Sequence, residues 1–208
     1  MKEDKLVPKR RFNEFENSEA WEQRKLDDIT ETITKGTTPI DKNWVGPVNY
    51  IKTESIDKES GNLTNTSNTS LEEHEGFLKR SQLKYNDVLF SIVGTLGRVG
   101  LVKAKDLPAN TNQQISIIRL KEINPYFAMN AFKTPCSKSY IASETTIGAQ
   151  PSLSLWQINK MEIAIPSIAE QNQIGTFFSN LDDLITLHQR KLEKLKNIKK
   201  AYLNEMFI

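Results

Sequence analysis

The last forty residues of the chain carry its most regular hydrophobic pattern. Ser167 and Glu170 stand three residues apart as a capping box, and the stretch that follows contains no proline and only Gly175 as a glycine. A stripe then recurs in sevens along two rows, with a third row widening it: Ile174, Leu181, His188, Leu195 and Tyr202; Phe177, Leu184 and Ile198; Phe178, Ile185, Leu192 and Met206. The pattern predicts one long helix from Ser167 to about Met206.

A helix of this length needs a surface that covers its stripe. At about 1.5 Å per residue it would span roughly 58 Å, whereas a preceding domain of about 165 residues has an expected radius of gyration of only about 15 Å. The stripe therefore indicates a partner helix. The alternative is a bent helix packed along its own domain. His188 and Lys191 interrupt the stripe near its middle, where polar residues can fix the register of paired helices.

Charge favours an antiparallel partner. Acidic residues occupy the first half of the predicted helix and basic residues crowd the second half around Glu193: Glu170, Asp182 and Asp183 against Arg190, Lys191, Lys194, Lys196, Lys199 and Lys200. A parallel pair would set like charges against each other, whereas an antiparallel pair sets each acidic half against a basic half.

Before Pro166 the pattern changes to short apolar runs separated by polar turns. It predicts strands at Val48–Lys52, Val88–Val93, Val99–Val102, Ile115–Leu120 and Met161–Ile165, with short helices after Asn124 and over Leu153–Asn159. Trp21, Leu26, Ile29 and Ile33 have a weak helical spacing that ends at Gly36, and polar Asp57–Ser70 is interpreted as an exposed loop.

These elements together predict an α+β fold with a mixed β-sheet, short helices and a final long helix in an antiparallel coiled coil. The predicted units are an N-terminal arm at 1–17 anchored by Phe12 and Phe15, a globular domain at 18–165, and a helix at 166–208.

Composition excludes several classes of protein. Cys136 is the sole cysteine and lies far from His74 and His188, so neither an internal disulfide nor a structural zinc site is expected. No apolar run approaches the roughly 20 residues of a membrane span, and no export signal is recognised, so we expect a cytoplasmic protein. A net charge of +2, from 28 basic and 26 acidic residues, does not by itself indicate a nucleic-acid binder.

No enzyme motif survives inspection. The glycines between Gly94 and Gly100 lack the Lys-Ser/Thr of a phosphate-binding loop and lie between two predicted strands, which favours a hairpin turn. Asn124-Pro125-Tyr126-Phe127 resembles an amino-methyltransferase motif but lacks its second proline, and a helix start explains the same residues. No nucleophile lies in a recognisable setting, so no catalytic residue and no metal ligand is assigned.

The order of several segments resembles the target-recognition domain of type I restriction-modification specificity subunits. The segments in the domain are Trp21–Leu26, Lys35–Pro39, Asn86–Ser91, Gly94–Gly100 and Asn112–Ile115. Those that resemble the family's helical spacer are Ile163–Pro166, Glu170–Ile174, Leu181–Asp182, Leu192–Lys200 and Met206–Phe207. The usual subunit resembles two such units in tandem, whereas this chain has one recognition domain and one long helix.

The resemblance implies a non-catalytic subunit that reads one half of a split double-stranded DNA target and docks a modification subunit. It also implies that methyl transfer with S-adenosylmethionine belongs to that modification subunit, and that ATP- and Mg²⁺-dependent cleavage belongs to a restriction subunit. The chain itself is then expected to hold no cofactor, and a second copy joined through the long helix would make a homodimer.

The candidate residues for DNA contact are polar or basic groups in predicted loops: Lys35, Thr37, Thr38, Lys52, Lys79, Arg80, Arg98 and Gln113. The candidate dimerisation residues lie on the helix stripe: Ile174, Phe178, Leu181, Leu184, Ile185, Leu192, Leu195 and Ile198. Three alternatives stay open, namely a regulator or antirestriction decoy that binds modification subunits without reading DNA, a truncated methyltransferase, and an inactive fragment of a longer subunit.

Overall fold

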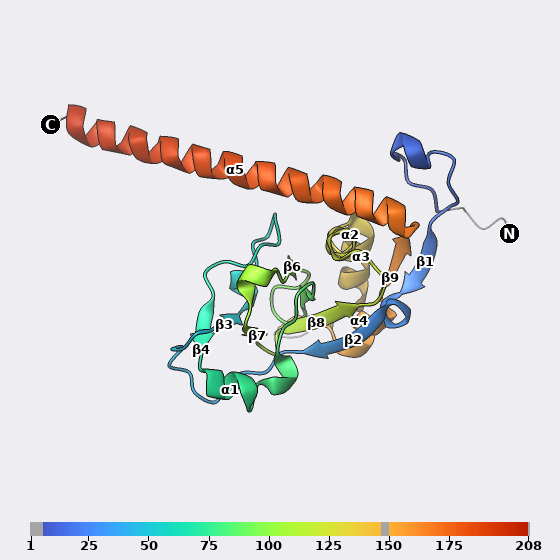
Figure 1. Ribbon diagram of the computed structural model, residues 1–208, viewed down its shortest axis with the longest axis horizontal. Coiled ribbons are helices and arrows are strands. Elements are labelled where there is room, and N and C mark those ends of the chain that lie inside the picture. The colour runs from blue at the N-terminus through green and yellow to red at the C-terminus, as the bar shows by residue number, and fades with distance from the viewer. Residues whose placement is uncertain (1–5, 147–149, 208) are drawn as a thin grey trace.

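The computed structural model describes residues 6–146 and 150–207 (Figure 1). The strands are β1 (Glu22–Lys25), β2 (Thr30–Lys35), β3 (Val48–Ile51), β4 (Ser67–Thr69), β5 (Val88–Ser91), β6 (Val99–Leu101), β7 (Ala109–Thr111), β8 (Ile115–Leu120) and β9 (Glu162–Ile165). The α-helices are α1 (Leu71–Glu75), α2 (Pro125–Ala131), α3 (Pro135–Glu144), α4 (Leu155–Lys160) and α5 (Ile168–Met206). Short 3₁₀ turns are η1 (Asn13–Phe15), η2 (Leu26–Ile29), η3 (Thr53–Ser55), η4 (Lys79–Ser81) and η5 (Ala104–Asp106).

A four-stranded antiparallel sheet in the order β2-β8-β5-β6 forms the centre of the domain. Strand β5 is buried along its whole length because alternate side chains enter two different cores. Val88 and Phe90 face a core shared with α2 and α4, whereas Leu89 faces a core that includes Ile51 and Ala109 of β3 and β7. An uninterrupted apolar run is typical of a strand covered on both faces.

Two smaller sheets flank the centre. Strands β4-β3-β7 form a mixed sheet in which β3 pairs with β7 in parallel, and β1 pairs with β9 in antiparallel. The β1/β9 pair joins the N-terminal part of the chain to the segment that leads directly into α5, so the two ends of the domain meet at the base of the long helix (Figure 1).

Helix α5 runs across one side of the domain and then projects past it, while α1, β3 and β4 lie on the opposite side (Figure 1). Ser167 caps its start by accepting a hydrogen bond from the Glu170 amide. Gly175 lets α5 approach α2 closely, because a Cβ at this position would lie 2.5 Å from Oδ1 of Asn124. Nearby, the Gln171 side-chain oxygen accepts a hydrogen bond from the Asn124 amide at 3.0 Å.

The N-terminal arm is tied to the first turn of α5. Arg11 donates two hydrogen bonds to the Glu170 carboxylate, at 2.8 and 2.6 Å, and it also donates to the carbonyls of Ser18 and Glu19. Phe12 packs edge-on against Phe177 of α5. The capping-box prediction is therefore half right, because Ser167 caps the helix but the Glu170 side chain bonds Arg11.

The α+β fold, the β5/β6 hairpin, the strands β3, β8 and β9, the helices α2 and α4, and the long helix α5 confirm the predictions from sequence. The helical spacing from Trp21 to Gly36 is wrong, since this segment forms β1, η2 and β2. Its β-branched Thr32 and Ile33 pair with β8, and Gly36 marks a close approach, because a Cβ there would lie 2.1 Å from the Thr111 carbonyl oxygen.

Two loop predictions also need correction. Within Asp57–Ser70, Leu63 is buried and bridges Ile56, and Ser67–Thr69 forms β4, so only part of the stretch is an exposed loop. Pro135 does limit α2, but it also opens α3, which sequence reasoning missed because this helix has no clear apolar face. The predicted loop at Gly148–Pro151 lies largely outside the described residues.

Across the described ranges, 6–146 and 150–207, no helix is both long and apolar enough to cross a membrane.

Candidate nucleic-acid interface

Three chain segments that follow strands β2, β3 and β7 meet at one place, which we call the loop cluster and define as residues 35–38, 52, 79–80 and 112–113. The Thr37 amide donates to the Thr111 carbonyl at 2.8 Å, and the Asn112 amide donates to the Ile51 carbonyl at 3.4 Å. The parallel pairing of Ile51 with Thr111 brings Lys52 and Asn112 out at the same end of the sheet. Candidates far apart in sequence are thereby collected on one surface.

Thr37 is the buried centre of the loop cluster. Its hydroxyl accepts a hydrogen bond from Nε of Arg80 at 3.0 Å, and its carbonyl accepts one from the Tyr50 hydroxyl at 2.9 Å. Burial raises the pKa of Tyr50 to about 12, so this hydroxyl stays a donor. Thr37 therefore positions Arg80, while Arg80 and its neighbour Lys79 are exposed on η4.

Lys52 is held in place by an aromatic side chain that sequence reasoning missed. Its ammonium lies 3.8 Å from the centre of the Trp44 ring, and Trp44 in turn packs against Tyr50 with ring centres 5.2 Å apart. Trp44 has a positive φ of 57° within an exposed loop, and the amides of Ile40 and Asp41 in that loop donate to the Glu73 carboxylate of α1. A tryptophan inside a proline-bounded polar loop was the available signal.

The eight DNA-contact candidates divide by their surroundings. Lys35, Lys79, Arg80 and Gln113 are exposed, Thr38 and Lys52 are half-buried, and Thr37 is buried. Arg98, in the β5–β6 turn, donates to the carbonyls of Thr53 and Ile56, each at 3.2 Å. Its guanidinium thus braces the turn against η3, directly after Lys52, and is partly committed to the fold.

His74 is not the solvated surface residue that the acidic run around it suggests. Its Nδ1 lies 2.5 Å from Oδ1 of Asn110, and the Asn110 amide donates to the carbonyl of Leu78. Asn110 is fully buried on β7. This pair fixes α1 and η4 against β7, and so supports the position of Arg80 from behind.

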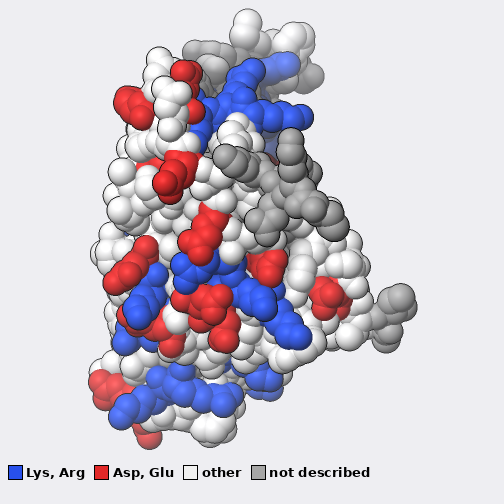
Figure 2. Space-filling view, turned by 90° about the vertical axis from the view of Figure 1, so that its right-hand side faces the viewer, with Lys and Arg blue, Asp and Glu red and all other residues white. Residues whose placement is uncertain are grey.

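Basic groups are not gathered on every face. Figure 2 shows the side that carries β1 and the N-terminal arm, where basic and acidic side chains are interleaved. Interleaved charge gives little long-range attraction for a polyanion, so this face is a poorer candidate for phosphate contact than the loop cluster.

The candidate dimerisation residues lie along α5 in two environments. Ile174 is half-buried and packs against the core that includes Phe127 of α2. The others have between 38% and 63% of their surface exposed: Phe178, Leu181, Leu184, Ile185, Leu192, Leu195 and Ile198. An apolar row this exposed on one helix marks an interaction surface.

Residues 18–197 match the family described as "Type I restriction modification DNA specificity domain". The chain belongs to this family. It is 28% identical over 199 residues to a Methanocaldococcus jannaschii protein named "Putative type I restriction enzyme MjaX specificity subunit", covering 91% of this chain and 46% of that protein. It is 27% identical over 135 residues to the type I restriction enzyme EcoBI specificity subunit of Escherichia coli, covering 62% of this chain and 28% of that protein.

Solved structures share the fold of this specificity domain. The S subunit of a type I restriction-modification system from M. genitalium matches 98% of this chain with a TM-score of 0.68 at 17% identity, over 48% of its own length. The HsdS subunit from Thermoanaerobacter tengcongensis matches 89% with a TM-score of 0.59 at 14% identity, over 46% of its length. The chain thus spans about half the length, or less, of the relatives it matches.

Proposed function

We propose that this specificity domain reads one half of a split double-stranded DNA target through the loop cluster. The observation that carries the proposal is the convergence of Lys35, Lys52, Arg80 and Gln113 on one surface by the parallel β3/β7 pairing. Arginine and glutamine side chains read guanine and adenine edges, and lysines hold phosphates. α1 and β3 lie on the side of the domain away from α5, so DNA contact leaves the helix free (Figure 1).

The proposal includes pairing with a second copy through α5. The exposed apolar row of its second half, the acidic first half and the basic second half support an antiparallel pair. A helix of 39 residues spans about 58 Å, so two domains at opposite ends of such a pair would contact half-sites more than one DNA turn of about 34 Å apart. A two-fold pair reads a split palindrome.

Methylation and cleavage in this proposal belong to other subunits. A modification subunit with S-adenosylmethionine transfers the methyl group, a restriction subunit with ATP and Mg²⁺ cleaves, and this chain positions them on DNA without holding a cofactor. The names of the relatives, which are specificity subunits of restriction enzymes, support this assignment.

Methylome sequencing tests the function in cells that express this chain with its modification subunit, compared with cells that express the modification subunit alone. A new adenine-methylated split palindrome is the expected result. Arg80→Ala should lower methylation of that motif at least tenfold, because a bidentate base contact contributes about 1–3 kcal/mol. Lys121→Ala, at the far end of β8 from the loop cluster, is the matched control and should leave the motif methylated.

The other outcomes separate the alternatives. An asymmetric split motif would keep DNA recognition but require a different second half. A folded chain that binds the modification subunit without directing any new methylation would support a decoy, and methyl transfer by the purified chain alone would support a methyltransferase.

A further inference from the structure

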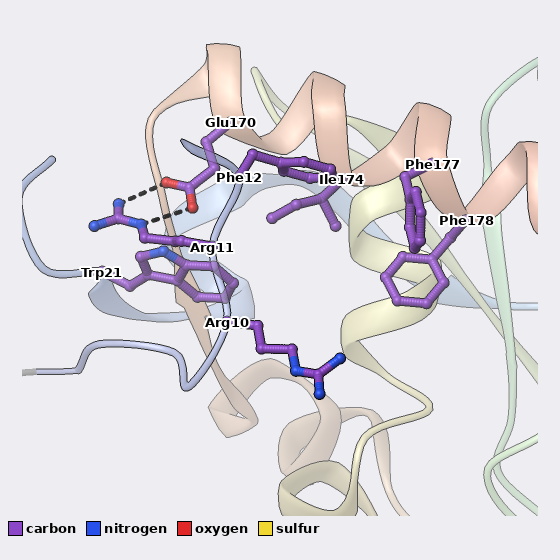
Figure 3. Close-up of a pocket in the computed structure, with 8 residues that line it drawn as sticks. All are labelled: Arg10, Arg11, Phe12, Trp21, Glu170, Ile174, Phe177 and Phe178. Atoms are coloured by element: carbon purple, nitrogen blue, oxygen red, sulfur yellow. Dashed lines mark hydrogen bonds and ion pairs between the residues drawn. The ribbon is translucent and has the colours of Figure 1, made fainter. Parts of the chain in front are cut away.

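A cavity lies at the base of α5, where the N-terminal arm crosses the helix (Figure 3). Its volume is about 430 Å³, and aromatic and aliphatic side chains supply much of its lining: Phe12, Trp21, Ile174, Phe177 and Phe178. The Arg11–Glu170 ion pair closes one end (Figure 3). Within the described residues the buried Nε1 of Trp21 has no hydrogen-bond acceptor, so the cavity combines apolar walls with an unused donor.

The last turn of α5 has the complementary chemistry. Met206 and Phe207 are 75% and 72% exposed, and with Tyr202 and Leu203 they form an apolar tip. The final carbonyls of any α-helix have no amide donor within the helix. The tip and the cavity lie at opposite ends of α5, so they cannot meet within one copy of the chain (Figure 1).

We propose that this cavity is the docking site for the α5 tip of a second copy of the chain. The inference rests on the antiparallel pairing proposed above and assigns the residues that close each end of the pair. Because the pair has two-fold symmetry, each copy would supply one cavity and one tip, so the contact is made twice.

The spacing of the two apolar rows fixes the register. When the rows of one helix pack against those of an antiparallel copy, every layer falls into step at once: Phe177 against Tyr202, Leu181 against Ile198, Leu184 against Leu195, and His188 against Lys191. The two-fold axis then passes between Gln189 and Arg190. In this register Met206 and Phe207 lie opposite the turn between Glu170 and Ile174, which lines the cavity.

Charge agrees with the same register. Asp183 falls opposite Lys196 of the second copy, and Asp182 falls next to its Lys199 and Lys200. The terminal carbonyls of the second helix reach the cavity together with the tip, where the Trp21 indole can donate to one of them. The register was derived from the apolar rows alone, so the charge match is independent support.

Iodide quenching of Trp21 fluorescence tests the contact. Trp44→Phe and Trp156→Phe leave Trp21 as the sole tryptophan in the full chain. Dimerisation should lower the quenching constant at least threefold between dilute and concentrated protein. Met206→Asp with Phe207→Asp should restore quenching in the dimer and raise the dimer Kd, measured by analytical ultracentrifugation, at least tenfold. Asn197→Asp with Asn204→Asp adds the same charge on the outer face of α5 and should change neither quantity.

The outcomes separate this inference from the pairing on which it rests. A chain that stays monomeric at every concentration overturns both. A dimer in which Trp21 is quenched as in the monomer, or in which the Met206 and Phe207 substitutions leave Trp21 protected, overturns the cavity contact and keeps the pairing.

An engineered disulfide tests the register. In a Cys136→Ser background, Phe177→Cys combined with Tyr202→Cys should yield a covalent dimer on mild oxidation. Phe177→Cys combined with Leu195→Cys, which lies about two turns out of step, should not. The reverse result would overturn the proposed layers.

Discussion

The two halves of α5 carry similar apolar stripes but lie in opposite surroundings. In the first half, Glu170, Gln171 and Gly175 are buried and the helix packs directly on α2. In the second half the stripe residues Leu192, Leu195 and Tyr202 are each more than half exposed. A helical stripe therefore predicts that a face will be covered, but the reach of the domain decides whether the chain covers that face itself.

The ion pairs of the two halves differ in the same way. Arg11 and Glu170 are nearly covered and make two hydrogen bonds at the docked end, whereas Lys196 and Glu193 are more than 60% exposed and lie 3.7 Å apart in the second half. Exposed pairs contribute little to stability, and covered pairs fix geometry. The docked half sets how the helix leaves the domain, and the second half remains available to a partner.

The largest expected effect comes from charging the second half. Leu181→Glu with Leu195→Glu should weaken self-association at least 100-fold, because each buried leucine contributes about 1.5–3 kcal/mol and the symmetric pair contains each residue twice. Sedimentation velocity measures the dimer. Gln189→Glu with Asn197→Glu, on the outer face, is the matched control. Retained dimers in the leucine variant would rule out the stripe as the interface.

Thermal unfolding of the globular domain in that leucine variant should be unchanged, since the domain core does not include either residue. A loss of domain stability would instead mean that the second half of α5 folds back on its own domain, which was the alternative to a partner helix.

A substitution in the docked half should act on stability. An alanine normally stabilises a helix by about 1 kcal/mol relative to glycine. At Gly175 the added Cβ would meet Asn124 Oδ1 and displace the residue that caps α2, so Gly175→Ala should instead destabilise the protein by about 1–2 kcal/mol. Thr176→Ala, on the exposed face, is the control. Chemical denaturation of both variants checks the sign, and stabilisation by Gly175→Ala would contradict the close packing.

The sequence predicted the elements that follow one strong local rule. The apolar run of β5, the capped start of α2 and the heptads of α5 each identify an element without knowledge of its neighbours. The segment from Trp21 to Gly36 misled, because Leu26 and Ile29 point into the core from a 3₁₀ turn and only the pairing of β2 with β8 decides its structure. Helix α3 was missed because it lacks an amphipathic pattern.

The loop cluster was predicted as a set of residue types but not as a site. Nothing local indicates that Lys52 and Gln113 emerge at the same end of a sheet, since that follows from the parallel pairing of β3 with β7. Likewise the bond between Arg80 and Thr37, and the Trp44 ring beneath Lys52, depend on tertiary contacts.

A smaller effect is expected from the arm that crosses the docked half. Glu170→Gln removes the charge that holds Arg11, so trypsin should cleave after Arg10 and Arg11 several-fold faster than in the parent protein. Glu193→Gln removes the exposed pair of the second half and should leave the cleavage rate unchanged, because such pairs contribute only about 0.5 kcal/mol. Equal cleavage in both variants would mean that the ion pair does not hold the arm.

The smallest effect is expected where the two halves meet, at Asp182. Burial raises the pKa of this carboxyl, the neighbouring Asp183 raises it further, and the charges of Lys133 and Lys103 partly oppose the shift. A folded-state pKa above the unfolded value of 3.8 means that the folded protein binds this proton more tightly. The contribution of Asp182 to stability is therefore fully present below pH 3.8 and is lost as the pH rises through the raised pKa.

Asp182→Asn should remove that pH dependence. The stability of the parent protein relative to the variant should fall as the pH rises from 3.8 through the raised pKa, when both are measured by denaturation at a concentration below self-association. A carbon-detected NMR titration of the Asp182 carboxyl reports the shift directly. A relative stability that rises with pH would mean that attraction to Lys133 outweighs burial, and that an ion pair braces the junction of the two halves.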